Sequence, residues 1–115
     1  MNTTHFIGNL GKAPTEIRLT KAGTAVTNFQ VAVDNPFTGR TTWIPVVVFG
    51  KIAEAAIDFL DKGDEVGVTG ELAMNEWDDD LGHHQQLQVI ARSLDFLRHR
   101  KTASDDTASE LEEAF

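Results

Sequence analysis

The sequence predicts an all-β domain, in which five strands close into a small barrel and one helix lies between the third and fourth strands. Three observations support this fold class. β-Branched and aromatic residues recur in short alternating segments, which is the pattern of half-buried strands. Only residues 51–62 place apolar side chains at helical spacing. Glycines recur among the predicted strands, as the sharply coiled strands of a small closed barrel require.

The part of the chain before the helix is predicted to be extended. Residues 5–10 open a strand, and residues 16–20 resume extended structure after Ala13-Pro14. Residues 34–40 have the composition of a turn-rich loop. Between them, residues 25–33 alternate, and one side of this strand carries Ala25, Thr27, Phe29, Val31 and Val33.

Residues 41–49 form the most informative predicted strand. Trp43 and Phe49 are six positions apart, so they project from the same face. The opposite face carries the aliphatic residues Ile44, Val46 and Val48, so it is predicted to face the core. Aromatic rings on the other face are suited to stacking on unpaired bases. From this segment alone, they could equally lie under a loop or in a subunit interface.

The second half of the chain supplies the helix and two more strands. A helix is predicted over residues 51–62, with Gly63 as a left-handed C-terminal cap. Residues 65–72 and 85–97 read as strands, and residues 75–84 as a polar loop that carries Trp77. The resulting order is three strands, one helix and two strands, which is typical of a five-stranded OB-fold barrel.

Composition and charge limit the classes of function. The 115 residues predict one domain over residues 1–101 and a short, disordered acidic tail over residues 102–115. The net charge is −8, but the tail alone contributes −5, so the domain is close to neutral. The charge therefore does not exclude binding of nucleic acid. Cysteine is absent, which excludes disulfides and thiolate metal sites. No signal peptide or membrane-spanning segment is evident, so we expect a cytoplasmic protein.

Three motifs resemble those of bacterial single-stranded DNA-binding proteins. They are Ile-Gly-Asn-Leu-Gly-Lys at 7–12, Gly-Thr-Ala-Val-Thr-Asn-Phe at 23–29 and Val-Val-Phe-Gly-Lys-Ile-Ala-Glu at 47–54. They occur in the same order and at compatible spacing, and the resemblance covers roughly residues 4–97. It implies an OB-fold homotetramer that binds and protects single-stranded DNA independently of sequence in replication, recombination and repair. It also implies association with the nucleoid and no cofactor.

The resemblance assigns roles to individual residues. Trp43, Phe49 and Trp77 match base-stacking positions, and Phe37 lies near a fourth; alternatively, Trp77 could fold back on its own hairpin. Positions expected along the phosphate path match Arg18 and Lys51, and further contacts are expected from Lys12, Lys21, Arg40 and Arg92. Lys51 could also be a helix-start lysine that simply reaches solvent. The three aspartates after Trp77 favour stacking over phosphate binding in that loop.

The end of the chain resembles the family's partner-recruiting tip, with Glu112, Glu113, Ala114 and Phe115. The basic cluster Arg98-His99-Arg100-Lys101 could contact either DNA or this acidic tail. No metal site is predicted, because His83 and His84 lack a third ligand at a recognisable spacing. No enzyme is predicted either, because no Ser/His/Asp or paired-carboxylate arrangement stands out. Two non-enzymatic alternatives are a primosome-type OB protein acting mainly through protein contacts and an OB-fold interaction module with no nucleic-acid role. Phe115 favours the single-stranded DNA-binding hypothesis over the primosome-type one.

Overall fold

The computed structural model describes residues 1–14 and 17–98. The predicted tail and its tip Glu112–Phe115, as well as His99, Arg100 and Lys101, lie outside the described residues. The described elements are β1 (Thr4–Leu10), β2 (Arg18–Leu19), β3 (Ala25–Asp34), β4 (Thr41–Phe49), α1 (Gly50–Phe59), β5 (Glu65–Asp79) and β6 (Gly82–Arg98). Over this part of the chain, no helix is long and apolar enough to cross a membrane.

Five strands form a closed ring in the order β1-β5-β6-β4-β3. The ring closes where Asn9 and Leu10 of β1 pair with Ala32 and Val31 of β3. β4 and β6 are joined by a short parallel pairing, whereas the other neighbours are antiparallel. β2 is a two-residue strand outside the ring, at the edge of β3. The predicted all-β OB-fold, with its helix between the third and fourth ring strands, is confirmed.

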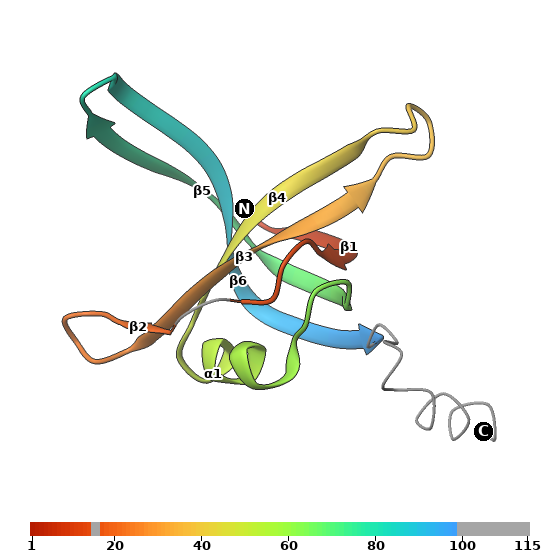
Figure 1. The fold of residues 1–115 in the computed structure, drawn as a ribbon, viewed down its shortest axis with the longest axis horizontal. Helices are drawn as coiled ribbons and strands as arrows, with labels where there is room; N and C mark the ends of the chain where they lie inside the picture. The colour runs from red at the N-terminus through yellow and green to blue at the C-terminus, as the bar shows by residue number, and fades with distance from the viewer. Residues whose placement is uncertain (15–16, 99–115) are drawn as a thin grey trace.

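The core follows from the alternation of each strand. Alternate residues of β3 and β4 are buried, so the predicted core faces of both strands are correct. Helix α1 adds Ala53 and Ala56 to the same core, Leu60 directly after it is also buried there, and in Figure 1 the helix lies at one end of the body. The largest fully buried side chains are almost all valines: Val31, Val46, Val48, Val66, Val68 and Val89.

The predicted C-terminal end of the helix is wrong. Helix α1 ends at Phe59 rather than at residue 62, because Leu60 is already extended, with φ −96° and ψ 134°. Gly63 does adopt a positive φ of 89°. Its N–H, however, donates to the carbonyl oxygen of Leu10 in β1 at 2.8 Å and not to the helix. The glycine therefore turns the chain back toward the sheet rather than capping α1.

The predicted polar loop over residues 75–84 is also wrong. β5 and β6 continue as a paired hairpin to Asp79 and Gly82, and only two residues form the turn. Side chains pair across these strands: Gln85 donates to Glu76 at 2.8 Å, and the rings of Trp77 and His84 stack at 5.4 Å. The β5–β6 arm projects from the same side of the body as the β3–β4 hairpin, opposite α1 (Figure 1).

Candidate nucleic-acid interface

The outer face of β3 and β4 forms a continuous track. Each residue of β4 on this face lies directly opposite a β3 residue, from Trp43 and Ala32 at one end to Phe49 and Val26 at the other. Trp43 and Phe49 are six positions apart along the strand, or about 20 Å. Trp43 is 53% exposed and Phe49 is 40% exposed. The two rings predicted to share a face therefore share it, with Pro45 and Val47 between them.

A groove of about 580 Å³ opens over one end of this track. β4 lies between β3 and β6 in the sheet, so its outer residues form the floor and its neighbours form the walls. The loop after β1 and the base of the β5–β6 arm complete the lining. The lining residues are Gly11, Lys12, Ala13, Asn28, Phe29, Gln30, Trp43, Pro45, Val46, Val47, Asn75, Gln86 and Gln88.

The position of Trp43 in the groove depends on Gly11. The six-membered part of the indole lies against the α-carbon of Gly11, so closely that a β-carbon there would overlap the ring. Gly11 is itself held by a hydrogen bond from its N–H to the Gln30 carbonyl oxygen at 3.0 Å. The loop after β1 therefore lies against the ring at Cζ3, and the ring remains half exposed.

Trp77 lies on the arm and does not line the groove. Its ring stacks on that of His84, the residue directly opposite it on β6, with an angle of 21° between the ring planes. It is 42% exposed. One face of the Trp77 ring therefore packs on its own hairpin, as the alternative prediction expected. The exposed part of the side chain is still accessible to a ligand.

Phe37 lies apart from the other aromatic residues of the site. It is in the turn between β3 and β4 and is 96% exposed. Asn35 shapes this turn, because its side-chain oxygen accepts the N–H of Phe37 at 2.9 Å. Phe37 does not line the groove. It could therefore meet only a ligand that extends to the end of the β3–β4 hairpin.

The six predicted phosphate contacts are all exposed, but only Lys12 lines the groove. No Lys or Arg in the ranges 1–14 and 17–98 forms an ion pair with another described residue, so these cations are available to an anionic ligand. Arg18 lies opposite Val26, which lies opposite Phe49, so Arg18 flanks the far end of the track. The other predicted contacts are more dispersed, and they are Lys21, Arg40, Lys51 and Arg92.

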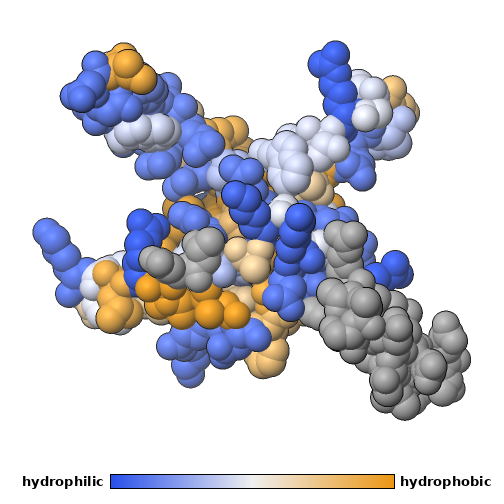
Figure 2. Space-filling model, viewed as in Figure 1, coloured by the Kyte–Doolittle hydropathy of each residue, from blue (hydrophilic) through white to orange (hydrophobic). Residues whose placement is uncertain are grey.

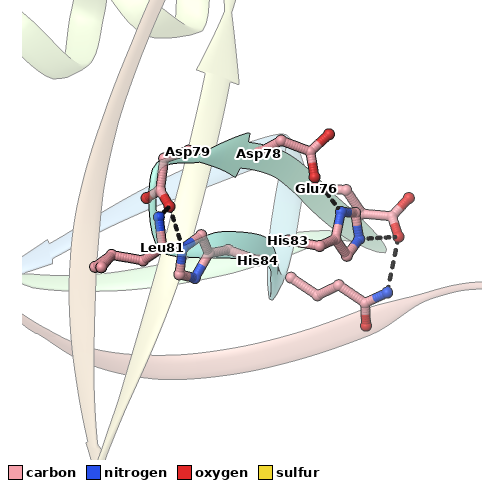
Figure 3. A network of polar contacts seen from close by, with 7 residues as sticks. Glu76, Asp78, Asp79, Leu81, His83 and His84 are labelled. Atoms are coloured by element: carbon pink, nitrogen blue, oxygen red, sulfur yellow. Dashed lines mark hydrogen bonds and ion pairs between the residues drawn. The ribbon is translucent and has the colours of Figure 1, made fainter.

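The end of the arm is acidic and internally paired (Figure 3). His83 lies between Asp78, at 2.8 Å, and Glu76, at 3.5 Å. His84 contacts Asp79 at 2.8 Å. Among the residues that the structure describes, no three His, Asp or Glu side chains converge on a position that could hold a metal ion. Figure 2 shows this arm as largely hydrophilic. Its carboxylates disfavour phosphates near the tip.

The sequence did not indicate the amides, which are the most numerous polar residues in the groove lining. Five of the lining residues carry carboxamides, and they come from three strands. Part of the signal was available: Asn28 and Gln30 alternate with the buried residues of β3, so they share the outer face of that strand. Their association with Asn75, Gln86 and Gln88 depends on the position of the β5–β6 arm, and the sequence predicts residues 75–84 of that arm as a loop.

Comparison with known proteins is consistent with this arrangement. The model of the single-strand binding protein family matches residues 1–97. A protein named single-stranded DNA-binding protein 2 from Listeria innocua is 36% identical over 115 residues, covering 95% of this chain and 72% of the relative. A protein of the same name from Clostridium acetobutylicum is 34% identical over 109 residues, covering 90% of this chain and 82% of the relative. The chain therefore belongs to the single-strand binding protein family.

Proposed function

We propose that residues 1–101 bind single-stranded DNA independently of its sequence and protect it during replication, recombination and repair. The observation that carries this proposal is the track from Trp43 to Phe49, an exposed aromatic and apolar strip beside a groove. Base faces stack on such a strip whatever their identity, with about 1–3 kcal/mol per base. The work proposed is binding rather than catalysis, in the cytoplasm and on nucleoid DNA, and it requires no cofactor.

Substitution of matched phenylalanines tests the track. Phe49→Ala removes a ring from the track, and Phe59→Ala removes a ring that is 65% exposed on helix α1 and packs against Phe96. We expect Phe49→Ala to weaken binding of oligo-dT by about 1–3 kcal/mol, and Phe59→Ala to leave it unchanged. Anisotropy of a labelled oligonucleotide measures both. Equal binding by the two variants would contradict the stacking proposal, and no binding by the wild type would favour the primosome-type alternative.

We further propose that the protein forms a homotetramer. β1 pairs with β5 from Thr4 to Asn9, but its other edge meets β3 only at Asn9 and Leu10. Within the described ranges, the edge from Thr4 to Gly8 thus has no strand partner, and Ile7 beside it is 59% exposed. Unpaired strand edges are used for association with another chain. Light scattering with and without oligo-dT gives the mass, and a monomer in both conditions would refute the proposal.

The acidic segment Glu112–Phe115 is proposed to recruit partner enzymes of replication and repair. Phe115 offers an apolar anchor, and Glu112 and Glu113 would steer it to a basic pocket. Deletion of these four residues should abolish capture of such enzymes from a cell extract and leave oligo-dT affinity unchanged or slightly raised. If full-length and truncated proteins retain the same enzymes, the recruitment proposal is wrong and DNA binding is unaffected.

A further inference from the structure

The nine Asn and Gln side chains of the chain fall into two groups. One group has a structural partner. Asn2 and Asn9 bind backbone groups at 2.9 and 3.0 Å, Asn35 accepts from the β3–β4 turn at 2.9 Å, and Gln85 donates to Glu76 at 2.8 Å. The other group makes no side-chain hydrogen bond with any described residue, and all of its members line the groove: Asn28, Gln30, Asn75, Gln86 and Gln88.

These five side chains form two rows that flank the floor of the groove. On one side, Asn28 and Gln30 of β3 lie directly opposite Val47 and Pro45 of β4. On the other side, the base of the β5–β6 arm supplies the second row. There Asn75 pairs with Gln86, and Gln88 follows two positions later on the same strand, which the sheet places next to β4. An apolar floor that includes Trp43 thus has hydrogen-bonding groups along both sides.

The charge of the groove favours bases over phosphates as the partners of these amides. Among the residues that the structure describes, Lys12 is the one charged residue of the lining, so this lining offers little to a row of phosphates. A carboxamide has two N–H donors and one carbonyl acceptor. The edge of an unpaired base also presents donors and acceptors, whereas a phosphate only accepts. An amide can rotate to match any of the four bases, which suits binding that is independent of sequence.

We propose that the five amides form a base-edge subsite. It binds the hydrogen-bonding edges of unpaired bases whose faces lie on Trp43 and the apolar floor. This inference rests on the proposed binding of single-stranded DNA and adds to stacking a second source of affinity that requires no net charge. Because a neutral hydrogen bond contributes modestly in water, loss of one amide should weaken binding about two- to tenfold. The loss should not change the salt dependence.

An oligonucleotide without base edges tests the subsite on the wild-type protein. Oligo-dT is compared with an oligomer of the same length in which difluorotoluene replaces thymine, because this ring keeps the shape and stacking surface but lacks the hydrogen-bonding edge. The subsite predicts that the wild type binds oligo-dT at least tenfold more tightly. Both measurements use the unmodified protein, so no failure of a variant to fold can obscure the result.

Matched substitutions then locate the effect. Gln30→Leu and Gln88→Leu each remove one groove amide, and Gln85→Leu makes the same change at a partnered residue outside the groove. The two groove variants should lose about two- to tenfold on oligo-dT and nothing on the difluorotoluene oligomer. The Gln85→Leu variant should match the wild type on both. Thermal unfolding midpoints confirm that each variant is folded.

The outcomes separate this inference from the proposed function. If the wild type binds both oligomers equally, or if the groove variants keep the full preference for oligo-dT, the subsite is refuted and single-stranded DNA binding stands. If the wild type binds neither oligomer, the proposed function is refuted and the subsite with it. The subsite is supported if Gln85→Leu keeps the preference for oligo-dT over the difluorotoluene oligomer while the two groove variants lose part of it.

Discussion

The contact between Gly11 and Trp43 gives a test of the groove that leaves both tryptophans in place. In Gly11→Ala, the new β-carbon would lie 3.1 Å from Cη2 and 3.4 Å from Cε3 of Trp43, and closer still to Cζ3. Carbon atoms pack at about 3.5–4.0 Å, so the ring must move by about 1 Å. Gly11 is not among the glycines with positive φ, so its backbone accepts alanine. The substitution therefore acts on the ring rather than on the fold.

The size of the effect follows from the contribution of one stacked base. Stacking contributes about 1–3 kcal/mol per base, and a ring displaced by about 1 Å keeps part of it. We expect Gly11→Ala to weaken oligo-dT binding by about 1 kcal/mol, or roughly fivefold. The free energy of unfolding should fall by less than this, because Trp43 is 53% exposed and has space to move outward.

A double-mutant cycle measures whether the effect passes through Trp43. Anisotropy of labelled oligo-dT gives the affinities of the wild type, Gly11→Ala, Trp43→Ala and the double variant. Gly11→Ala should weaken binding in the wild type and have no further effect once Trp43 is alanine. An equal loss in both backgrounds would refute the stated role of Trp43. No loss in either would show that the position of the ring does not matter for binding.

Three further predictions follow from the same structure. Because few cations lie near the groove, the slope of log K against log salt should be shallow at about −0.7 per neutralised phosphate; a steep slope in a NaCl titration would contradict this. Thr27→Val should raise the free energy of unfolding in urea by about 1 kcal/mol, because Thr27 is buried and its hydroxyl has no hydrogen-bond partner among the described residues; a lowered value would refute it. Gly70→Ala should lower the free energy of unfolding by about 1–3 kcal/mol, because its β-carbon would overlap the Ile90 backbone oxygen. Gly67→Ala is the matched control, because the nearest contact of its β-carbon is at 3.5 Å. Equal stability of the two variants would contradict the argument.

The features that could be predicted from the sequence are those set within one strand. Alternation assigned Val46 and Val48 to the core and Trp43 and Phe49 to the outer face, because successive side chains of a strand point to opposite faces. The order of the elements then indicated the OB-fold. Neither inference requires knowing which strands are neighbours.

The arm and the groove lining depend on contacts between strands, so the sequence could not give them in the same way. Asn and Asp disfavour strands, which made residues 75–84 resemble a loop. The structure pairs them with β6 through contacts such as Glu76 with Gln85 and Trp77 with His84, which lie seven to nine positions apart. The same pairing brings Asn75 to the groove. Cross-strand pairs of this kind cannot be recognised from the periodicity of either strand alone.

β4 serves both the core and the candidate binding surface, since Val46 and Val48 are buried on one side and Trp43 and Phe49 are exposed on the other. An insertion of a single residue ahead of Trp43 that shifted the pairing by one position would turn these rings inward and the valines outward. Folding and binding would then be lost together. A length change in the turn between β3 and β4, by contrast, can leave this register intact. Two requirements therefore constrain the spacing of residues within β4: burial of Val46 and Val48 in the core, and exposure of Trp43 and Phe49 to the proposed ligand.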